Sequence, residues 1–271
     1  MARKKSTKSD IDDELSTIRA EIDNPLNFKL NVKCKTKKQK EFLNSILTKE
    51  ISFVIGIAGT GKSYISIYGA LQLLKDLSNG YEKIIFIYPV ELSKEDNLGF
   101  LKGTLDQKIQ PYTEADIYTM EKIIDASGKN GKEVVQKLIS QGMIEFKSAS
   151  FLRGCSIDNS LVLVSECQNF SKDTFLKILT RIGTNSRYIF SGDSGQLDAQ
   201  SIKSGKNIMG LKYAIEKLCD LPEFGFIEFG LEDVIRNDII VKILKRWDPI
   251  TNGNLNEEEE FRKAQEEKLN E

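Results

Sequence analysis

The sequence has 271 residues, 40% of them hydrophobic, and a formal net charge of −1. This is enough for one large domain with a sizeable core, and the balanced charge gives no global attraction to nucleic acid. The chain has no histidine, which removes the commonest general base, the usual nitrogen ligand of metals and every serine–histidine mechanism. Any catalysis must therefore use carboxylates, lysine, arginine, hydroxyls or a metal bound through oxygen.

Two exclusions concern location and cross-links. The sequence has no apolar run as long as a membrane span, and its basic start is not followed by the apolar segment of a signal peptide. We therefore expect a cytoplasmic protein. The four cysteines are widely spaced and contain no Cys-x-x-Cys pair, so neither a zinc site nor a disulfide framework is predicted.

The two ends of the chain differ from its middle in composition. Residues 1–29 are predicted to be an N-terminal extension, in which Ser9 to Ile22 has the apolar spacing of an amphipathic helix. Residues 249–271 are acidic, have few apolar groups and predict a frayed tail. The chemistry is therefore expected in residues 30–248.

A basic cluster lies near the start of this central region. Its lysines are Lys33, Lys35, Lys37, Lys38 and Lys40. Such a cluster is either a local nucleic-acid patch or a solvated face, and the sequence alone leaves both interpretations open.

The next segment carries the strongest signal in the chain. An apolar strand from Ile51 to Ile55 runs into a glycine-rich turn of the form G-x-x-x-x-G-K-S, and a helix is predicted from Tyr64 to Leu77. Backbone N–H groups of such a loop point at phosphates, Lys62 can reach the outer phosphates, and the Ser63 hydroxyl can bind magnesium. The loop residues that would contact the nucleotide are Gly56, Ala58, Gly59, Thr60 and Gly61. The alternative, a plain strand-to-helix turn, leaves Lys62 and Ser63 unexplained.

Short apolar strands then alternate with helical stretches along the chain. The predicted strands are Ser52 to Ile57, Lys83 to Tyr88, Met143 to Phe146, Leu161 to Ser165, Tyr188 to Ser191 and Phe226 to Phe229. This alternation predicts an α/β fold with a doubly wound, mostly parallel sheet in a single domain. Its ligands should bind at the carboxyl ends of the strands, where the phosphate loop already lies.

Polar residues follow two of these strands. Glu166 and Gln168 come after the strand that ends at Ser165, placed to polarise a water and to sense a terminal phosphate. Asp193 and Gln196 follow the next strand and should lie at the same edge of the sheet. The structural alternative for Asp193 is a helix N-cap.

Taken together, these blocks resemble the PhoH-like ATPases, which share their core with superfamily 1 helicases. The resemblance runs from about Lys37 to about Arg246 and rests on several blocks in the same order. They are Gly56-Ile-Ala-Gly-Thr-Gly-Lys-Ser63, Pro89-Val-Glu, Leu98-Gly-Phe-Leu-Lys-Gly with the following residues to Tyr112, Phe151-Leu-Arg-Gly154, Glu166-Cys-Gln-Asn169, Leu179-Thr-Arg-Ile-Gly183, Gly192-Asp-Ser-Gly-Gln196 and Asp233-Val-Ile-Arg236.

The resemblance implies a RecA-like core that binds ATP and Mg²⁺, hydrolyses ATP, and works with RNA or single-stranded nucleic acid, as a homo-oligomer that can be a ring. It implies that Lys62 and Ser63 hold phosphate and metal and that Glu166 is the base. It also implies that Gln39 reads the adenine edge and that Arg236 approaches a phosphate, across a subunit boundary if it acts as an arginine finger. For Gln39 and Arg236 a helix-surface role remains open.

Two positions depart from the family pattern. The family has aspartate where this chain has Ser165, so the expected metal-site group is a neutral hydroxyl, unless a neighbouring acid such as Asp193 supplies the charge. The family has arginine where this chain has Tyr88. Two other functions therefore stay open: an ATP-binding regulatory module with slow or no hydrolysis, and an ATPase that acts on a protein partner.

Two residues are weaker candidates for contact with nucleic acid. Arg153 follows a strand, where a nucleic-acid backbone or a neighbouring subunit could meet it, although structural arginines are common in such loops. Tyr112 could stack on a base, as aromatic side chains in single-strand channels do. For Phe100, core packing is an alternative to stacking.

Overall fold

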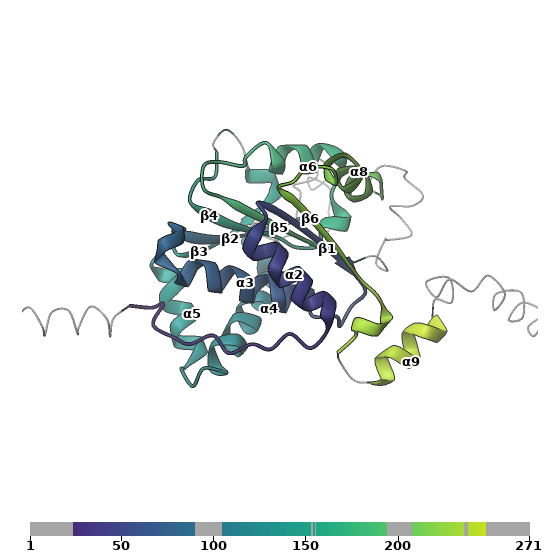
Figure 1. Cartoon of the computed structure of the whole chain (residues 1–271). Coiled ribbons are helices and arrows are strands. Elements are labelled where there is room, and N and C mark those ends of the chain that lie inside the picture. Colours follow the sequence, from purple (N-terminus) through teal and green to yellow (C-terminus); the bar gives the residue numbers. More distant parts are fainter. Residues whose placement is uncertain are drawn as a thin grey trace, which may run out of the picture.

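The computed structural model describes residues 24–89, 105–152, 154, 156–193, 208–235 and 238–247. Strands of this part of the chain form one six-stranded sheet in the order β3-β2-β4-β5-β1-β6, and every neighbouring pair is parallel (Figure 1). The strands are β1 (Ile51–Gly56), β2 (Lys83–Tyr88), β3 (Ile144–Ser148), β4 (Ser160–Val164), β5 (Arg187–Gly192) and β6 (Phe224–Phe229).

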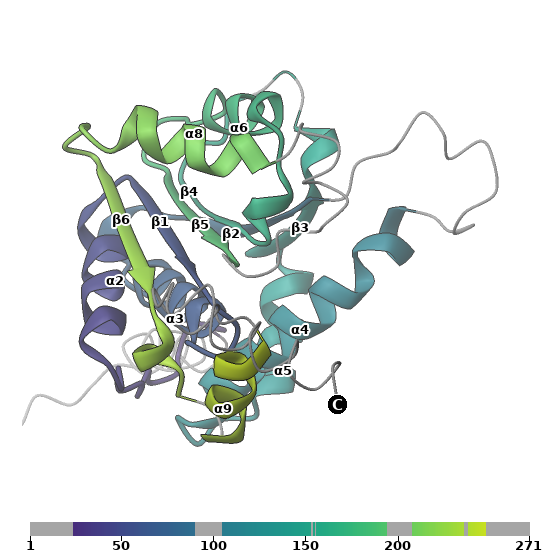
Figure 2. The same cartoon turned by 90° about the vertical axis from the view of Figure 1, so that its right-hand side faces the viewer.

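Helices cover both faces of the sheet (Figures 1 and 2). One face packs against α2 (Lys37–Thr48), α3 (Lys62–Lys75), α4 (Leu105–Asp125) and α5 (Gly131–Ser140), and the other against α6 (Lys172–Leu179) and α8 (Ile208–Leu218). Helix α9 (Asp238–Trp247) lies apart from both layers (Figure 1). The short 3₁₀ helices are η1 (Leu77–Asn79), η2 (Ala149–Phe151), η3 (Cys167–Asn169) and η4 (Leu231–Asp233).

The inner strands are apolar because both of their faces are covered. Every residue of β4 is buried, as expected for a parallel strand between two helical layers. Neighbouring residues in β1 point into different cores: Val54 packs on the α2–α5 side, and Phe53 packs on the α6–α8 side. The Phe53 ring stacks on Phe190 of β5, with centroids 4.3 Å apart.

The predicted fold class is confirmed. Each of the six predicted strand regions overlaps an observed strand, with bounds that differ by at most two residues. Helix α3 begins two residues before the predicted start at Tyr64 and ends two before the predicted end at Leu77. None of the described helices combines the length and the apolar character needed to cross a bilayer.

The ends of the chain fall mainly outside the described residues. The amphipathic helix predicted from Ser9 to Ile22 and the acidic tail lie there. The last part of the segment assigned to the extension is described, however, and Leu26 and Phe28 are buried in the core on the α2–α5 side. Lys75 of α3 lies over the Phe28 ring and donates a hydrogen bond to the Leu26 carbonyl, so this segment packs on the domain.

Candidate nucleotide site

The loop that follows β1 has positive φ angles at its glycines. Gly56, Gly59 and Gly61 have φ angles of +153°, +90° and +87°, which glycine adopts without strain. A Cβ on Gly56 would also lie 2.7 Å from the Cβ of Phe229 in β6. Helix α3 begins directly after Gly61, so the N–H groups of its first turn lie at the loop. Such a helix N-terminus favours anions.

The two side chains that the motif assigns to phosphate and metal lie at the same place. The Lys62 ammonium is folded against the loop, with Nζ 2.5 Å from the Gly56 carbonyl oxygen and 2.9 Å from that of Ile57. Ser63 lies in the first turn of α3, and both residues line one cavity. The loop side therefore brings an ammonium, a hydroxyl and a helix N-terminus to one cavity, which suits a phosphate chain.

Helix α2 supports this loop from behind through Gln39. Gln39 is only 1% exposed, and its amide donates a hydrogen bond to the Thr60 carbonyl at 2.8 Å. Its carbonyl oxygen accepts a hydrogen bond from the Lys35 N–H at 2.7 Å. A Cβ on Gly61 would lie 2.9 Å from the Gln39 amide nitrogen. The Gln39 amide, which the resemblance assigns to adenine, is thus bonded to one carbonyl of the loop and to one N–H ahead of α2.

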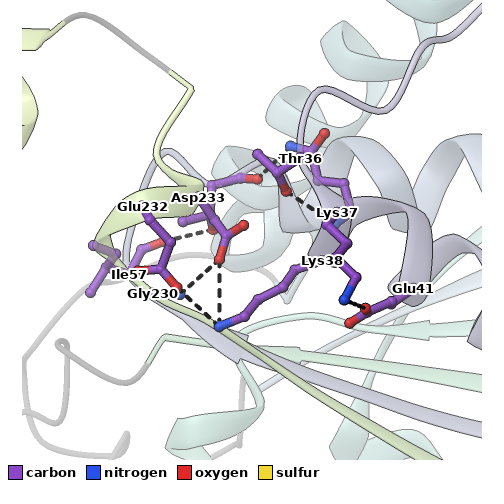
Figure 3. A network of polar contacts seen from close by, with 10 residues as sticks. Thr36, Lys37, Lys38, Glu41, Ile57, Gly230, Glu232 and Asp233 are labelled. Atoms are coloured by element: carbon purple, nitrogen blue, oxygen red, sulfur yellow. Dashed lines mark hydrogen bonds and ion pairs between the residues drawn. The ribbon is translucent and has the colours of Figure 1, made fainter.

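A network of polar contacts holds α2 to the segment after β6 (Figure 3). The Lys38 ammonium lies 3.2 Å from a carboxylate oxygen of Glu232 and 3.7 Å from one of Asp233. Asp233 is buried and accepts a hydrogen bond from the Gly230 N–H. Two residues later, the Ile235 N–H donates to the Gly59 carbonyl at 3.2 Å. The network therefore fixes the segment that leads from η4 to the phosphate loop.

The acidic side of the site is assembled at the ends of β4 and β5. Glu166 follows β4 in the left-handed region, with φ +54°, a conformation that is rare for residues other than glycine and clusters at functional sites. Gln168 donates a hydrogen bond to the Glu166 carboxylate at 2.7 Å and accepts one from the Asp193 N–H at 2.9 Å. Because Gln168 is only 3% exposed, one buried amide fixes both strand ends.

Asp116 of α4 is a residue of this site that sequence reasoning missed. It is 7% exposed and accepts a hydrogen bond from the Tyr88 hydroxyl at 2.8 Å. Burial raises the pKa of the Asp116 carboxyl to about 6, the Tyr88 hydrogen bond opposes that rise, and the negative charge of Glu166 adds to it. A signal was present in the sequence: Asp116 shares the buried stripe of α4 with Ile109 and Met120, where a carboxylate is unusual.

These elements enclose a cavity of about 480 Å³. Its wall consists of Ala58, Gly59, Gly61, Lys62, Ser63, Tyr64, Ala115, Asp116, Thr119, Glu166, Ser191, Gly192, Asp193 and Ile235. Three carboxylates therefore share the wall with one ammonium. The described residues contain no group of three or more His, Cys, Asp or Glu side chains spaced to hold a metal alone. The donor set instead fits a metal that arrives with phosphate oxygens and binds the Ser63 hydroxyl.

The structure brings most of the predicted site residues together. Ala58, Gly59, Gly61, Lys62, Ser63, Glu166 and Asp193 line the cavity, while Gly56, Thr60, Gln39 and Gln168 support its wall. Ser165 does not line it; the Ser165 N–H donates to the Ile87 carbonyl. The Tyr112 ring stacks on Tyr88, with centroids 5.4 Å apart. Arg153, Gln196 and Arg236 lie outside the described residues, so their roles stay predictions.

A parallel sheet with a glycine loop between a strand and the N-terminus of a helix, and with acidic strand ends beside it, defines a P-loop NTPase fold. Within this class, the model of the family described as "PhoH-like protein" matches residues 31–248. The chain therefore belongs to the PhoH-like family.

Individual relatives agree with this assignment. A PhoH-like protein of Bacillus subtilis is 30% identical over 80% of this chain and 64% of its own length. One from Synechocystis is 29% identical over 80% of this chain and 62% of its own length. The chain thus spans about six-tenths of these relatives. The large terminase of a thermophilic bacteriophage superposes with a TM-score of 0.44 and 11% identity over 76% of this chain and 48% of its own, which decides nothing about function.

Proposed function

We propose that this protein binds ATP together with Mg²⁺ in the cavity beside the phosphate loop and hydrolyses it to ADP and phosphate. The observation that carries the proposal is the shared cavity: Lys62 and Ser63 line it from the loop side, and Glu166 lines it from the end of β4. Membership of the PhoH-like family supports the choice of nucleotide. A nucleotide hydrolase needs a phosphate cradle and a water-activating carboxylate at one place.

Each residue has a definite task in this reaction. The loop N–H groups bind phosphate oxygens, and Lys62 exchanges its Gly56 and Ile57 carbonyl partners for a phosphate oxygen. Bound Mg²⁺ supplies charge neutralisation at the phosphates. Glu166 orients a water and takes its proton as the water oxygen attacks the terminal phosphorus, and the bridging bond breaks with its electron pair going to ADP. Gln168 keeps the Glu166 carboxylate in place.

We further propose that turnover is coupled to RNA or another single-stranded nucleic acid and that the chain works as a homo-oligomer. Family membership supports this coupling. In this proposal Arg153 and Tyr112 meet the nucleic acid, and Arg236 meets the phosphates of a neighbouring subunit. The net charge of −1 means that such a partner would be held by a local patch and not by a long-range field.

A single-turnover assay with radiolabelled ATP, with and without single-stranded RNA, tests the function. We expect wild-type protein in excess over ATP to convert it to ADP in a magnesium-dependent phase that RNA accelerates. Glu166→Gln should bind ATP without that phase. If the wild type binds ATP without hydrolysing it, the alternative of an ATP-binding regulatory module is favoured. If RNA does not change the hydrolysis rate, the alternative of an ATPase that acts on a protein partner is favoured. Absence of ATP binding would overturn the proposal.

A further inference from the structure

The end of β4 has a neutral side chain where P-loop NTPases commonly use an aspartate. In these enzymes the metal is held by the loop Ser or Thr and by a carboxylate from a neighbouring strand end. Here that strand end is Ser165, which does not line the cavity. The Ser165 N–H donates to the Ile87 carbonyl at 3.2 Å, so Ser165 lies beside the end of β2.

Tyr88, the residue beside Ser165 in the sheet, binds the carboxylate of Asp116 in helix α4. Ile87 pairs with Val164, so Tyr88 and Ser165 follow at the same level of the sheet. Tyr88 is fully buried, and its hydroxyl donates a hydrogen bond of 2.8 Å to Asp116. The end of β4 therefore carries no carboxylate at Ser165, but Tyr88 at the end of β2 holds the Asp116 carboxylate in the cavity wall.

A cation in this cavity would also stabilise the ionised form of Asp116. A buried carboxylate has two oxygens with about four acceptor sites, and the Tyr88 hydroxyl uses one of them. Burial and the charge of Glu166 both disfavour the ionised form of Asp116. A divalent cation in the cavity would reverse that penalty, because opposite charge stabilises a buried carboxylate.

Strand order alone favours Asp193 as the source of the carboxylate charge beside the metal, but the strand register does not place Asp193 level with Ser165. Phe190 pairs with Val164, so Asp193 comes two positions beyond the level of Ser165. The Asp193 backbone N–H is bonded to Gln168, which connects this residue to the Glu166 side of the wall. Asp116 instead lies against Tyr88, the direct neighbour of Ser165.

We propose that Asp116 supplies the carboxylate charge beside the nucleotide-bound magnesium that Ser165 lacks, and that Tyr88 is the residue that positions it. This inference rests on the proposed function, because the metal arrives with ATP. In this arrangement the carboxylate comes from helix α4 instead of a strand end, and a tyrosine of the adjoining strand fixes it. Glu166 stays available for the attacking water.

Asp116→Asn tests the proposal, since its amide oxygen can still accept the Tyr88 hydrogen bond while the charge is lost. Calorimetry would measure ATP affinity in Mg²⁺ and in EDTA, and the electron paramagnetic resonance of Mn²⁺ would report metal binding directly. We expect the metal-dependent gain in affinity to fall about tenfold, as for groups that act on a metal through an outer shell. Affinity in EDTA should hold or improve. Tyr88→Phe should lose a smaller part of the gain.

The matched control is Glu114→Gln, which removes a charge from an exposed position of the same helix and should change nothing. Ser165→Asp should restore the metal response in the Asp116→Asn background and bring no gain alone, because it would crowd like charges. Asp193→Asn should have the smaller effect.

An unchanged metal response in folded Asp116→Asn would overturn the inference. If that variant fails to fold, the proposal is overturned when Ser165→Asp alone strengthens the metal response of the wild type. A wild type that binds no ATP in either condition would overturn the proposed function itself, and this inference with it.

Discussion

The two sides of the cavity are built in different ways. The loop side comes from one short run of sequence, Gly56 to Ser63, whose glycines allow its turns. Its backbone carbonyls accept hydrogen bonds from Lys62 within the loop and from Gln39 and Ile235 outside it. The acidic side is assembled from three distant segments, which contribute Asp116, Glu166 and Asp193. The Asp116 and Glu166 carboxylates are held by the side chains of Tyr88 and Gln168. The residues of the loop side are therefore adjacent in the sequence, whereas those of the acidic side become neighbours only once the sheet has formed.

This difference separates the expected consequences of mutation. Changes on the loop side should act on nucleotide binding, because the backbone and Lys62 meet the phosphates there. Changes on the acidic side should act on turnover and metal response while ATP still binds, because Glu166 comes from the end of β4 and not from the phosphate loop. A mutation that breaks this division would show that the two sides act as one unit.

The largest effect is expected for Lys62→Ala. Each charge-assisted hydrogen bond to phosphate is worth about 1.5–3 kcal/mol, so magnesium–ATP affinity should fall at least tenfold and turnover should be lost. Calorimetry and an ADP-release assay measure both quantities. Lys132→Ala, which removes an exposed lysine of α5, is the control and should behave as the wild type. Unchanged affinity together with unchanged turnover in Lys62→Ala would remove the loop from the mechanism.

The second prediction is that Glu166→Gln slows ATP hydrolysis and leaves ATP binding intact. The substituted amide can still accept the Gln168 hydrogen bond, so the wall keeps its shape while the base is lost. We expect ATP affinity within about twofold of wild type and hydrolysis slower by roughly 10²–10⁴-fold, the usual contribution of a general base. Single-turnover rates would decide this, and equal rates in the two proteins would favour the non-hydrolysing alternative.

The same division explains what the sequence could and could not predict. The strands, the loop and the positions of Lys62, Ser63 and Glu166 follow from local pattern, and the structure places these side chains around one cavity. Asp116 could not be assigned to the site from the sequence because it lies on a helix, far from any motif. Only the packing of α4 on the sheet brings it to Tyr88. The hydrogen bonds of the Gln39 amide could not be predicted for the same reason. Its partners, the Thr60 carbonyl and the Lys35 N–H, are backbone groups that become its neighbours on folding.

A smaller effect is expected for Gln168→Ala, which tests the side-chain support of the acidic side. The change leaves the buried Asp193 N–H without this partner, which costs about 1–3 kcal/mol, or roughly 2–4 °C of Tm for each kcal/mol. Turnover should fall about tenfold because Glu166 is less well oriented.

Gln168→Glu separates the two hydrogen bonds of this residue. It keeps an acceptor for the Asp193 N–H and places a like charge beside Glu166. Part of the stability lost in Gln168→Ala should return through the Asp193 hydrogen bond, offset by the buried like charge, while turnover stays low, as thermal melts and rates would show. Full recovery of turnover in Gln168→Glu would contradict the positioning role.

The smallest effect is expected for Gln39→Ala, and it separates two roles for one amide. The resemblance assigns Gln39 to the adenine edge, whereas the structure bonds its amide to the Thr60 carbonyl and the Lys35 N–H. Of these two bonds only the one to Thr60 reaches the loop, and losing one neutral hydrogen bond costs about 1 kcal/mol, or roughly fivefold in affinity. If the amide acts by shaping the loop, this loss should be the same for every ligand that fills the phosphate cradle. We therefore predict an equal, roughly fivefold weakening for ATP, GTP and inorganic tripolyphosphate, measured by calorimetry in Mg²⁺.

The control is Gln136→Ala, which removes an exposed amide from α5 and should leave all three affinities unchanged. A loss confined to ATP would show instead that the amide turns to the base when the nucleotide binds, and the loop would then keep its shape without Gln39.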